Sequence, residues 1–251
     1  MDPIDVVMLT KNSAYMLEKC LSSLYANVPV KRLIVVDGFS TDRTLNIIAH
    51  FNEKYNNIRV LRIKGTRAKA REIGIAEVET AWFMFFDSDV MLSRDWFKHA
   101  VANVGQGVGA VWGLNLDVIP NLKGKRLLRL QEQVARRSFG LRGGTHDTLV
   151  LRESVKGIRI PEKLHTHEDA YIINWIRKKG YKIKVGEGIY CLHYKPTENW
   201  TMKNAFAQSL LELKCGLVYS RNLRYVLYYP VFMFYWFMQL SLQTTGKLLS
   251  R

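Results

Sequence analysis

Short apolar runs alternate with helix-like segments along the first 90 residues of the chain. Four apolar runs of strand length lie at residues 4–9, 33–36, 58–63 and 82–86. Between them, apolar residues recur at helical spacing over residues 17–24, 45–51 and 68–76. Strands that alternate with helices at this spacing usually pair in one direction. The pattern therefore predicts an α/β fold with a mostly parallel sheet flanked by helices.

The alternation becomes less regular after residue 116. The elements expected there are a strand over 110–116, a basic helix over 123–139, a helix over 169–179 that ends at Gly180, and two short strands over 181–193. No internal repeat and no linker rich in Pro, Gly or Ser divides the sequence. We therefore expect one domain over residues 1–200, with halves 1–116 and 117–200, and a helical tail over residues 201–251.

The tail contains two apolar segments of different kinds. An amphipathic helix is indicated by apolar residues at helical spacing, namely Ala205, Phe206, Leu210, Leu213 and Leu217. Farther on, residues 225–246 carry no charge and reach the ~20 residues that a membrane span needs. Their Tyr and Trp content fits the lipid–water interface better, so we expect peripheral, monotopic membrane association. The alternative is a helical pair packed on the domain or in a dimer, and the oligomeric state stays open.

The net charge indicates an anionic partner. The 251 residues include 37 Lys and Arg against 22 Asp and Glu, which gives a net charge of +15. Hydrophobic residues at 48% and charged residues at 24% exclude the disordered and low-complexity classes. Three widely separated cysteines exclude a zinc ribbon and a disulfide framework. Nucleic acid, an anionic membrane surface or a phosphorylated substrate would each match the charge.

Part of this charge is concentrated between residues 123 and 142, where seven Lys and Arg side chains accompany Glu132 as the one acidic residue. A solvated helix face is the ordinary reading of such a run. Nucleic-acid binding favours aromatic residues interleaved with basic ones, whereas the aromatic residues here gather in the uncharged tail. We therefore expect no nucleic-acid partner, and a phosphorylated acceptor or anionic lipid headgroups instead.

Two carboxylates follow directly after the apolar run 82–86, in the tripeptide Asp87-Ser88-Asp89. Ligands of parallel α/β sheets bind at the carboxyl ends of the strands. Two carboxylates one residue apart at such an end can converge on a hard divalent cation and, through it, on a diphosphate. An ordinary turn is the alternative, because Asp and Ser are common in turns.

Five motifs in order resemble the GT-A glycosyltransferases of the large inverting family 2, including its dolichol-phosphate sugar synthase-like members that use lipid-linked acceptors. The resemblance extends from about Ile4 to Lys195. The motifs are residues 6–12 with the following helix, 35–44 around Asp37, 65–75 around Arg71, 85–89 with the two aspartates, and 167–183 with Glu168 and Asp169. The resemblance implies a GT-A, Rossmann-like fold in which residues 1–116 bind the donor and residues 117–200 bind the acceptor and carry out catalysis.

The resemblance also implies roles for individual residues. The nucleotide-sugar site, for a UDP- or GDP-sugar, would comprise Thr10, Asn12, Asp37, Arg71, Asp87, Ser88 and Lys195. A divalent cation, Mn²⁺ or Mg²⁺, would be held by Asp87, Asp89 and His193. Asp169 would be the general base, with Glu168 beside it in the catalytic motif.

The leading hypothesis is an inverting, metal-dependent hexosyltransferase at the cytoplasmic face of the membrane, held there by its tail and acting on a lipid-linked acceptor. A soluble or protein-linked glycan as acceptor is an alternative, and a basic nucleic-acid-binding protein is an alternative of another class. The chain departs from the family at Glu72, where Asn is common, and at Gly38, where a second Asp is common. No Q-x-x-R-W motif follows Asp169, which argues against a processive polysaccharide synthase.

Overall fold

The first half of the chain folds as the alternation of apolar runs predicts. The computed structural model describes residues 1–117, 143–164, 166–194, 201–221, 223–231, 233, 234, 237 and 241. The first elements are β1 (Ile4–Thr10), α1 (Leu17–Asn27), β2 (Val30–Asp37), α2 (Thr44–Tyr55), β3 (Ile58–Arg62), α3 (Arg67–Ala76) and β4 (Trp82–Phe86). All the strands and helices predicted in this half are confirmed, with bounds that differ by a few residues.

The second half contains more elements than the sequence pattern predicts. They are β5 (Val90–Leu92), α4 (Trp96–Ala102), β6 (Val108–Asp117), β7 (Asp147–Leu151), α6 (Arg152–Val155), α7 (Glu168–Lys178), β8 (Lys182–His193), α8 (Met202–Cys215) and the π-helical turn η2 (Gly216–Ser220). The predictions of β6 and α7 are confirmed. The short elements β5, α4, β7 and α6 were not predicted, and the basic helix expected over 123–139 lies outside the described residues.

The prediction of two short strands over 181–193 is wrong, because β8 is one strand of 12 residues. Gly186 and Gly188 interrupt its apolar pattern in the sequence, and Gly188 has a φ of 73°. The pairing with β6 continues past both glycines through a register shift between Trp112 and Leu114. A local irregularity in the ladder therefore replaces the expected chain break.

Eight strands of the described residues form one sheet in the order β3-β2-β1-β4-β7-β6-β8-β5. The pairs β3–β2, β2–β1, β1–β4 and β6–β8 are parallel, while β7 and β5 run antiparallel to their neighbours. Strand β1 lies between two parallel neighbours, and its residues Val6, Val7 and Met8 are fully buried. Burial on both faces explains why such strands appear in the sequence as continuous apolar runs.

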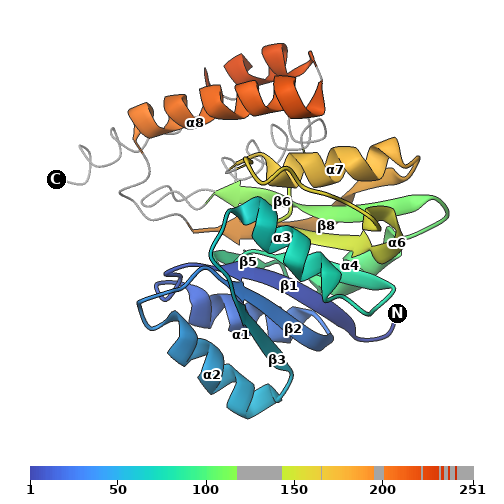
Figure 1. The fold of residues 1–251 in the computed structure, drawn as a ribbon. Coiled ribbons are helices and arrows are strands. Elements are labelled where there is room, and N and C mark those ends of the chain that lie inside the picture. The colour runs from blue at the N-terminus through green and yellow to red at the C-terminus, as the bar shows by residue number, and fades with distance from the viewer. Residues whose placement is uncertain are drawn as a thin grey trace.

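Helices cover both faces of this sheet (Figure 1). One apolar cluster packs α1, α2 and α4 on one face, through residues such as Leu21, Ile48 and Trp96. A second cluster packs α3, α6 and α7 on the other face, through Ala68, Val155 and Ile172. The carboxyl ends of β1, β2 and β4 lead into loops.

The described C-terminal helices continue the layer that begins with α7. Figure 1 shows α7 between α8 and the sheet. Cys215 and Tyr219, from the end of α8 and from η2, join the apolar cluster of α7. A further helical segment at residues 225–231 buries Tyr225, Tyr228 and Tyr229. Among the described residues, no helix has the combination of length and hydrophobicity that crossing a bilayer requires.

Close packing between α3 and β1 makes Gly74 a sensitive position. A Cβ atom at Gly74 would overlap the side chain of Val7, while one at Gly105 would meet no atom within 4 Å. We expect Gly74→Ala to lower the free energy of unfolding by about 1–3 kcal/mol through overpacking, despite the better helix propensity of Ala. Urea denaturation measures this effect, with Gly105→Ala as the matched control. Equal stability of the two variants would contradict the packing described here.

Candidate active site

The site begins where the parallel strands β1, β2 and β4 end. Thr10 at the end of β1 pairs in register with Asp37 at the end of β2, and β4 on the other side of β1 leads directly into Asp87. Polar side chains after three neighbouring strands are thereby brought to one edge of the sheet. This arrangement places the predicted nucleotide-binding residues Thr10, Asp37 and Asp87 along a single edge.

Asp37 holds this edge together from inside the protein. Its carboxylate is fully buried and accepts hydrogen bonds from Thr10 Oγ1 at 3.0 Å, from Ser40 Oγ at 2.5 Å and from the Ser40 backbone N–H at 2.9 Å. Arg62 Nε lies 3.7 Å from its second oxygen. Burial of a carboxyl group costs free energy unless hydrogen bonds compensate for the lost water. The described contacts therefore make Asp37 the anchor of the loop that follows β2.

The loops after β1 and β2 are joined by hydrogen bonds that involve the predicted residue Asn12. Its Oδ1 accepts from the Thr41 N–H at 2.9 Å, and its own N–H donates to Ser40 Oγ at 2.9 Å. Ser13 and Ser88 share a hydrogen bond of 2.9 Å between their hydroxyl groups. Asn12 thus joins the loop after β1 to the loop after β2, and Ser88 joins the loop after β4 to the loop after β1.

A buried arginine pairs with the first aspartate of the D-x-D motif. Arg71 Nη2 contacts Asp87 Oδ1 at 2.5 Å, and the Arg71 side chain is 4% exposed. The guanidinium lies over the ring of Phe85, 5.0 Å from its centre. Its Nε and Nη1 atoms are buried and have no hydrogen-bond partner among the described residues. Arg71 therefore has donors available beside the carboxylate that it holds.

The second aspartate of the motif meets the predicted histidine. His193 Nε2 lies 3.2 Å from Asp89 Oδ2, and these side chains are 10% and 28% exposed. The hydroxyl of Tyr15 lies 3.4 Å from the same oxygen and donates to the Tyr194 carbonyl at 2.9 Å. A carboxylate oxygen and an imidazole nitrogen, partly open to solvent, are a donor set that suits Mn²⁺.

The expected cation site fits this corner only in part. In the described part of the chain, no group of three His, Cys, Asp or Glu side chains converges as a metal site requires. Asp89 and His193 come together, whereas Asp87 Oδ1 is directed to Arg71. The role of Asp87 as a direct metal ligand stays a prediction.

Asn115 on β6 contacts the His193 ring at Nδ1, the ring nitrogen that does not face Asp89. Its Nδ2 lies 3.2 Å from His193 Nδ1 and 3.4 Å from His146 Nε2, while its buried Oδ1 has no partner among the described residues. Whether Asn115 donates to either ring depends on which ring nitrogen of that histidine carries the proton. Asn115 therefore contacts Nδ1 of the same imidazole ring whose Nε2 faces Asp89.

A buried carboxyl group lies under the same corner, on the unpredicted strand β7. Asp147 pairs in register with Phe86 and accepts a hydrogen bond from Trp96 Nε1 at 2.8 Å. Burial raises the pKa of Asp147 to about 7, with a smaller contribution from the charge of Asp87. Only a glycine fits at position 113, because a Cβ there would overlap the carboxyl group of Asp147.

The predicted catalytic residues begin helix α7. Glu168 and Asp169 occupy its first turn and are 5% and 9% exposed. Asp169 Oδ1 accepts from the Ala170 N–H at 2.7 Å. Burial raises the pKa of Glu168 to about 7, the charge of Asp169 adds to the rise, and Arg67 and Arg71 oppose it. Arg71 is thus close enough to influence Glu168 while it contacts Asp87.

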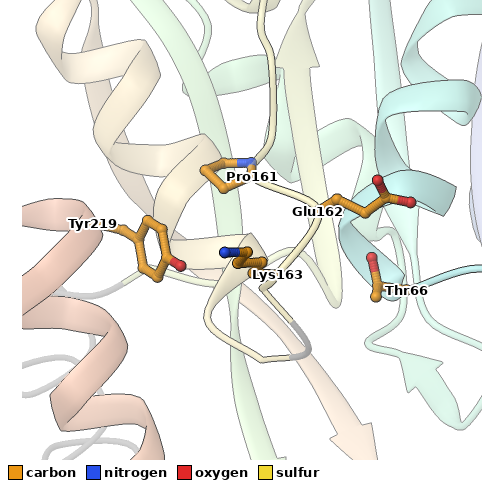
Figure 2. Close-up of a pocket in the computed structure, with 5 residues that line it drawn as sticks. All are labelled: Thr66, Pro161, Glu162, Lys163 and Tyr219. Atoms are coloured by element: carbon orange, nitrogen blue, oxygen red, sulfur yellow. The ribbon is translucent and has the colours of Figure 1, made fainter.

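A surface cavity of about 690 Å³ opens beside the loop that leads to α7. Figure 2 shows Tyr219 on one side of the cavity and Thr66, at the start of α3, on the other, with Pro161, Glu162 and Lys163 from the loop between them. An aromatic ring and several polar groups line it together. The cavity therefore lies next to the elements that carry Arg67 and the acidic pair.

The structure also adds residues that sequence reasoning missed. Tyr15, Asn115, His146 and Asp147 join the corner of Asp89 and His193, and Phe39 lies under Arg62 at 4.6 Å in a left-handed conformation with a φ of 59°. The sequence signal for Phe39 was an aromatic residue within the motif around Asp37. The structure shows that its side chain is 40% exposed. Lys195 lies outside the described residues, so its predicted role is not placed.

Comparisons with known proteins agree with this architecture. Residues 5–158 match the Glycosyl transferase family 2. Glycosyltransferase AglE of Haloferax volcanii is 30% identical over 125 residues, which cover 47% of this chain and 41% of AglE. Poly(ribitol-phosphate) beta-N-acetylglucosaminyltransferase TarS of Staphylococcus aureus is 29% identical over 107 residues, which cover 40% of this chain and 18% of TarS. The chain therefore spans less than half the length of these curated relatives.

Solved structures show the same fold. The mannosyltransferase PcManGT from Pyrobaculum calidifontis, in complex with GDP-Man and Mn²⁺, has a TM-score of 0.72 at 17% identity, with 100% of this chain and 76% of that chain covered. A fragment of S. aureus TarS in complex with UDP-GlcNAc has a TM-score of 0.59 at 21% identity, with 84% and 66% covered. The expected GT-A type of α/β fold is confirmed.

Asp147 should make the stability of the protein depend on pH. Its ordinary pKa is 3.8 and its folded pKa is about 7, so the folded state keeps a proton that the unfolded state loses. The free energy of unfolding therefore falls as pH rises from about 4 to 7. We expect Asp147→Asn to lose this part of the pH dependence, and urea denaturation at pH 5 and pH 8 measures it. Asp2→Asn, at an exposed position, is the control. An unchanged slope in Asp147→Asn would refute the assignment.

Proposed function

The chain belongs to glycosyl transferase family 2, and we propose that it moves a sugar from a nucleoside-diphosphate sugar to an acceptor, with inversion at the anomeric carbon. One observation carries the proposal: Arg71 contacts Asp87 at the donor edge and also acts on the pKa of Glu168 in the acidic pair. Donor-binding and proton-accepting groups therefore belong to one site, built from separate elements of the fold.

The charges at the sheet edge suit a nucleoside-diphosphate sugar. Transfer builds negative charge on the departing diphosphate, and the unpaired donors of the buried Arg71 are available to stabilise it. Asp89 and His193 would hold the divalent cation, and a bound Mn²⁺ or Mg²⁺ would neutralise diphosphate charge. PcManGT and TarS, which share the fold, were solved with GDP-Man and with UDP-GlcNAc. We infer a UDP- or GDP-sugar as the donor class.

Asp169 is the proposed general base. Its neighbour Glu168 is nearly fully buried, and its raised pKa of about 7 lets Glu168 carry a proton near neutral pH. In this proposal, the Asp169 carboxylate takes a proton from an acceptor hydroxyl. The proposed cation ligands come from the loop after β4, which carries Asp89, and from the end of β8, which carries His193. The proposed base Asp169 comes from α7, so the cation and the base can face opposite sides of the reacting sugar.

The acceptor that the observations favour is anionic. The chain carries a net charge of +15, and Lys163 lines the cavity next to the acidic pair. We propose a lipid-linked acceptor, as in the dolichol-phosphate sugar synthase-like group. The relative TarS is named for a poly(ribitol-phosphate) acceptor, which favours a phosphate-containing polymer as the second candidate.

Exposed apolar side chains on the C-terminal helices support our proposal of membrane association. The large apolar side chains exposed there are Phe206, Leu210, Leu211, Val218, Leu223, Val226, Leu227, Val231, Phe234 and Phe237. Exposed apolar groups of this number mark an interaction surface on a soluble protein. We propose that this surface enters the headgroup region of the cytoplasmic leaflet, and that Lys203 and Arg224, exposed on the same helices, meet its anionic lipids.

Loss of the base should abolish transfer but preserve donor binding. We expect Asp169→Asn to lower kcat for sugar transfer roughly 10²–10⁴-fold, because general-base catalysis contributes about that much. Thermal shift with a panel of UDP- and GDP-sugars and Mn²⁺ should give the same stabilisation as in the parent protein. Asp89→Asn is the contrasting variant, which should lose the cation-dependent part of donor binding. Full transfer activity in Asp169→Asn would refute the proposed role of Asp169 as the general base.

The apolar surface gives a separate prediction about lipid binding. Leu227 is 77% exposed, and we expect Leu227→Glu to weaken co-flotation with vesicles of anionic phospholipid roughly tenfold, because a charge replaces a side chain that enters the lipid. Val60→Glu, at an exposed apolar position on β3, is the matched control and should float as the parent protein does. Equal flotation of both variants would show that this surface does not meet the membrane.

A further inference from the structure

Helix α8 packs on the protein through a side that carries polar residues beside the apolar Leu213 and Cys215. The sequence indicates an apolar face formed by residues such as Phe206 and Leu210, yet these two are 51% and 47% exposed. Ser209 and Glu212 are buried instead, at 2% and 8% exposure. Burying a carboxyl group is costly unless it receives hydrogen bonds. The buried carboxyl group of Glu212 therefore needs hydrogen-bond partners inside the protein.

Glu212 lies at the centre of a buried hydrogen-bond cluster. Its Oε1 accepts from Thr166 Oγ1 at 3.3 Å and from Gln208 Nε2 at 2.9 Å, and its Oε2 accepts from the hydroxyl of Tyr229 at 2.9 Å. Gln208 Nε2 also contacts Thr166 Oγ1 at 2.8 Å. The cluster thus connects α8 and the 225–231 segment with Thr166, two residues before Glu168.

The backbone at this point needs such support. His167, between Thr166 and Glu168, has a φ of 69°, a left-handed conformation that is strained for a residue with a side chain. His167 is the N-cap residue of α7 and, among the described residues, makes no side-chain capping hydrogen bond there. The His167 ring packs edge-on against Tyr225, with 5.4 Å between the ring centres. Residues of the C-terminal helices therefore hold both sides of the turn from which the acidic pair begins.

We propose that Glu212 and Tyr229 are positioning residues for Asp169, and that the C-terminal helices are part of the catalytic apparatus in addition to any membrane role. The proposal rests on the proposed function of Asp169 as the base. Its physical content is that the cluster fixes Thr166 and the strained His167, and so sets where the first turn of α7 presents its carboxylates. Small displacements of a base cost large factors in rate.

The test compares hydroxyl deletions in the full chain, in detergent, with no membrane present. Tyr229→Phe removes the hydrogen bond to Glu212, while Tyr25→Phe removes one of 2.7 Å to Asn57 on the opposite face of the sheet. We expect Tyr229→Phe to lower kcat roughly tenfold with an unchanged KM for the donor, because donor-binding residues lie on other elements. Tyr25→Phe should keep the parent kcat.

Glu212→Gln is the second variant, and it keeps the volume of the side chain. We expect it to lower kcat at least as much and to shift the acid limb of the kcat–pH profile, since the surroundings of the acidic pair change. A role confined to stability would lower the Tm in all three variants and leave this profile in place. Parent-like kcat and pH profile in folded Glu212→Gln and Tyr229→Phe would overturn the proposal.

Hydrogen–deuterium exchange separates this proposal from the proposed function. We expect amides of residues 166–172 to exchange faster in Tyr229→Phe and Glu212→Gln, with exchange in Tyr25→Phe equal to that of the parent protein. This readout needs no turnover. Absence of transfer by the parent protein with every nucleotide sugar, together with faster exchange in the two variants, would refute the proposed function and retain the positioning. Unchanged exchange would refute the positioning itself.

Discussion

The hydrogen bonds that converge on the buried Asp37 carboxylate set the geometry of the donor edge. They join the end of β1, through Thr10, to the end of β2 and to the loop at Ser40. That loop in turn holds the backbone of Asn12. Because β4 is the other parallel neighbour of β1, fixing β1 against β2 also fixes where Asp87 emerges. The register of three strands thus becomes the spacing of the polar groups that a diphosphate would meet.

Much of this edge could be predicted from the sequence, since it follows from local pattern alone. The run 82–86 is apolar and Asp87 and Asp89 come next, so both the strand and its polar end are visible in the chain. The buried contacts of Asp147 beneath this edge could not be predicted in the same way. Asp147 reaches Trp96 and Gly113 from strand β7, which is inserted antiparallel between β4 and β6. Contacts between segments 30 to 50 residues apart, with no shared periodicity, leave no signature in a single sequence.

The C-terminal helices show a different limit of pattern reading. Periodicity establishes that α8 has one apolar face, but it does not say whether protein, lipid or a second chain covers that face. The structure buries Glu212 and exposes Phe206, the reverse of what a helix packed on a soluble domain would show. Both predicted roles of the tail, membrane association and packing on the domain, are therefore compatible with one helix, because they use opposite faces of it.

The distribution of charge links these parts. The described site gathers carboxylates, at Asp37, Asp87, Asp89 and the pair on α7, in a chain whose net charge is +15. Left without partners, such a cluster would repel an anionic donor. Arg71 offsets this by contacting Asp87 while opposing the rise in the pKa of Glu168. Coulomb interactions add, so the guanidinium charge of Arg71 acts on Asp87 and on Glu168 at the same time. Under the proposed function, the negative charge of a diphosphate bound beside Arg71 would oppose the effect of the guanidinium on the pKa of Glu168.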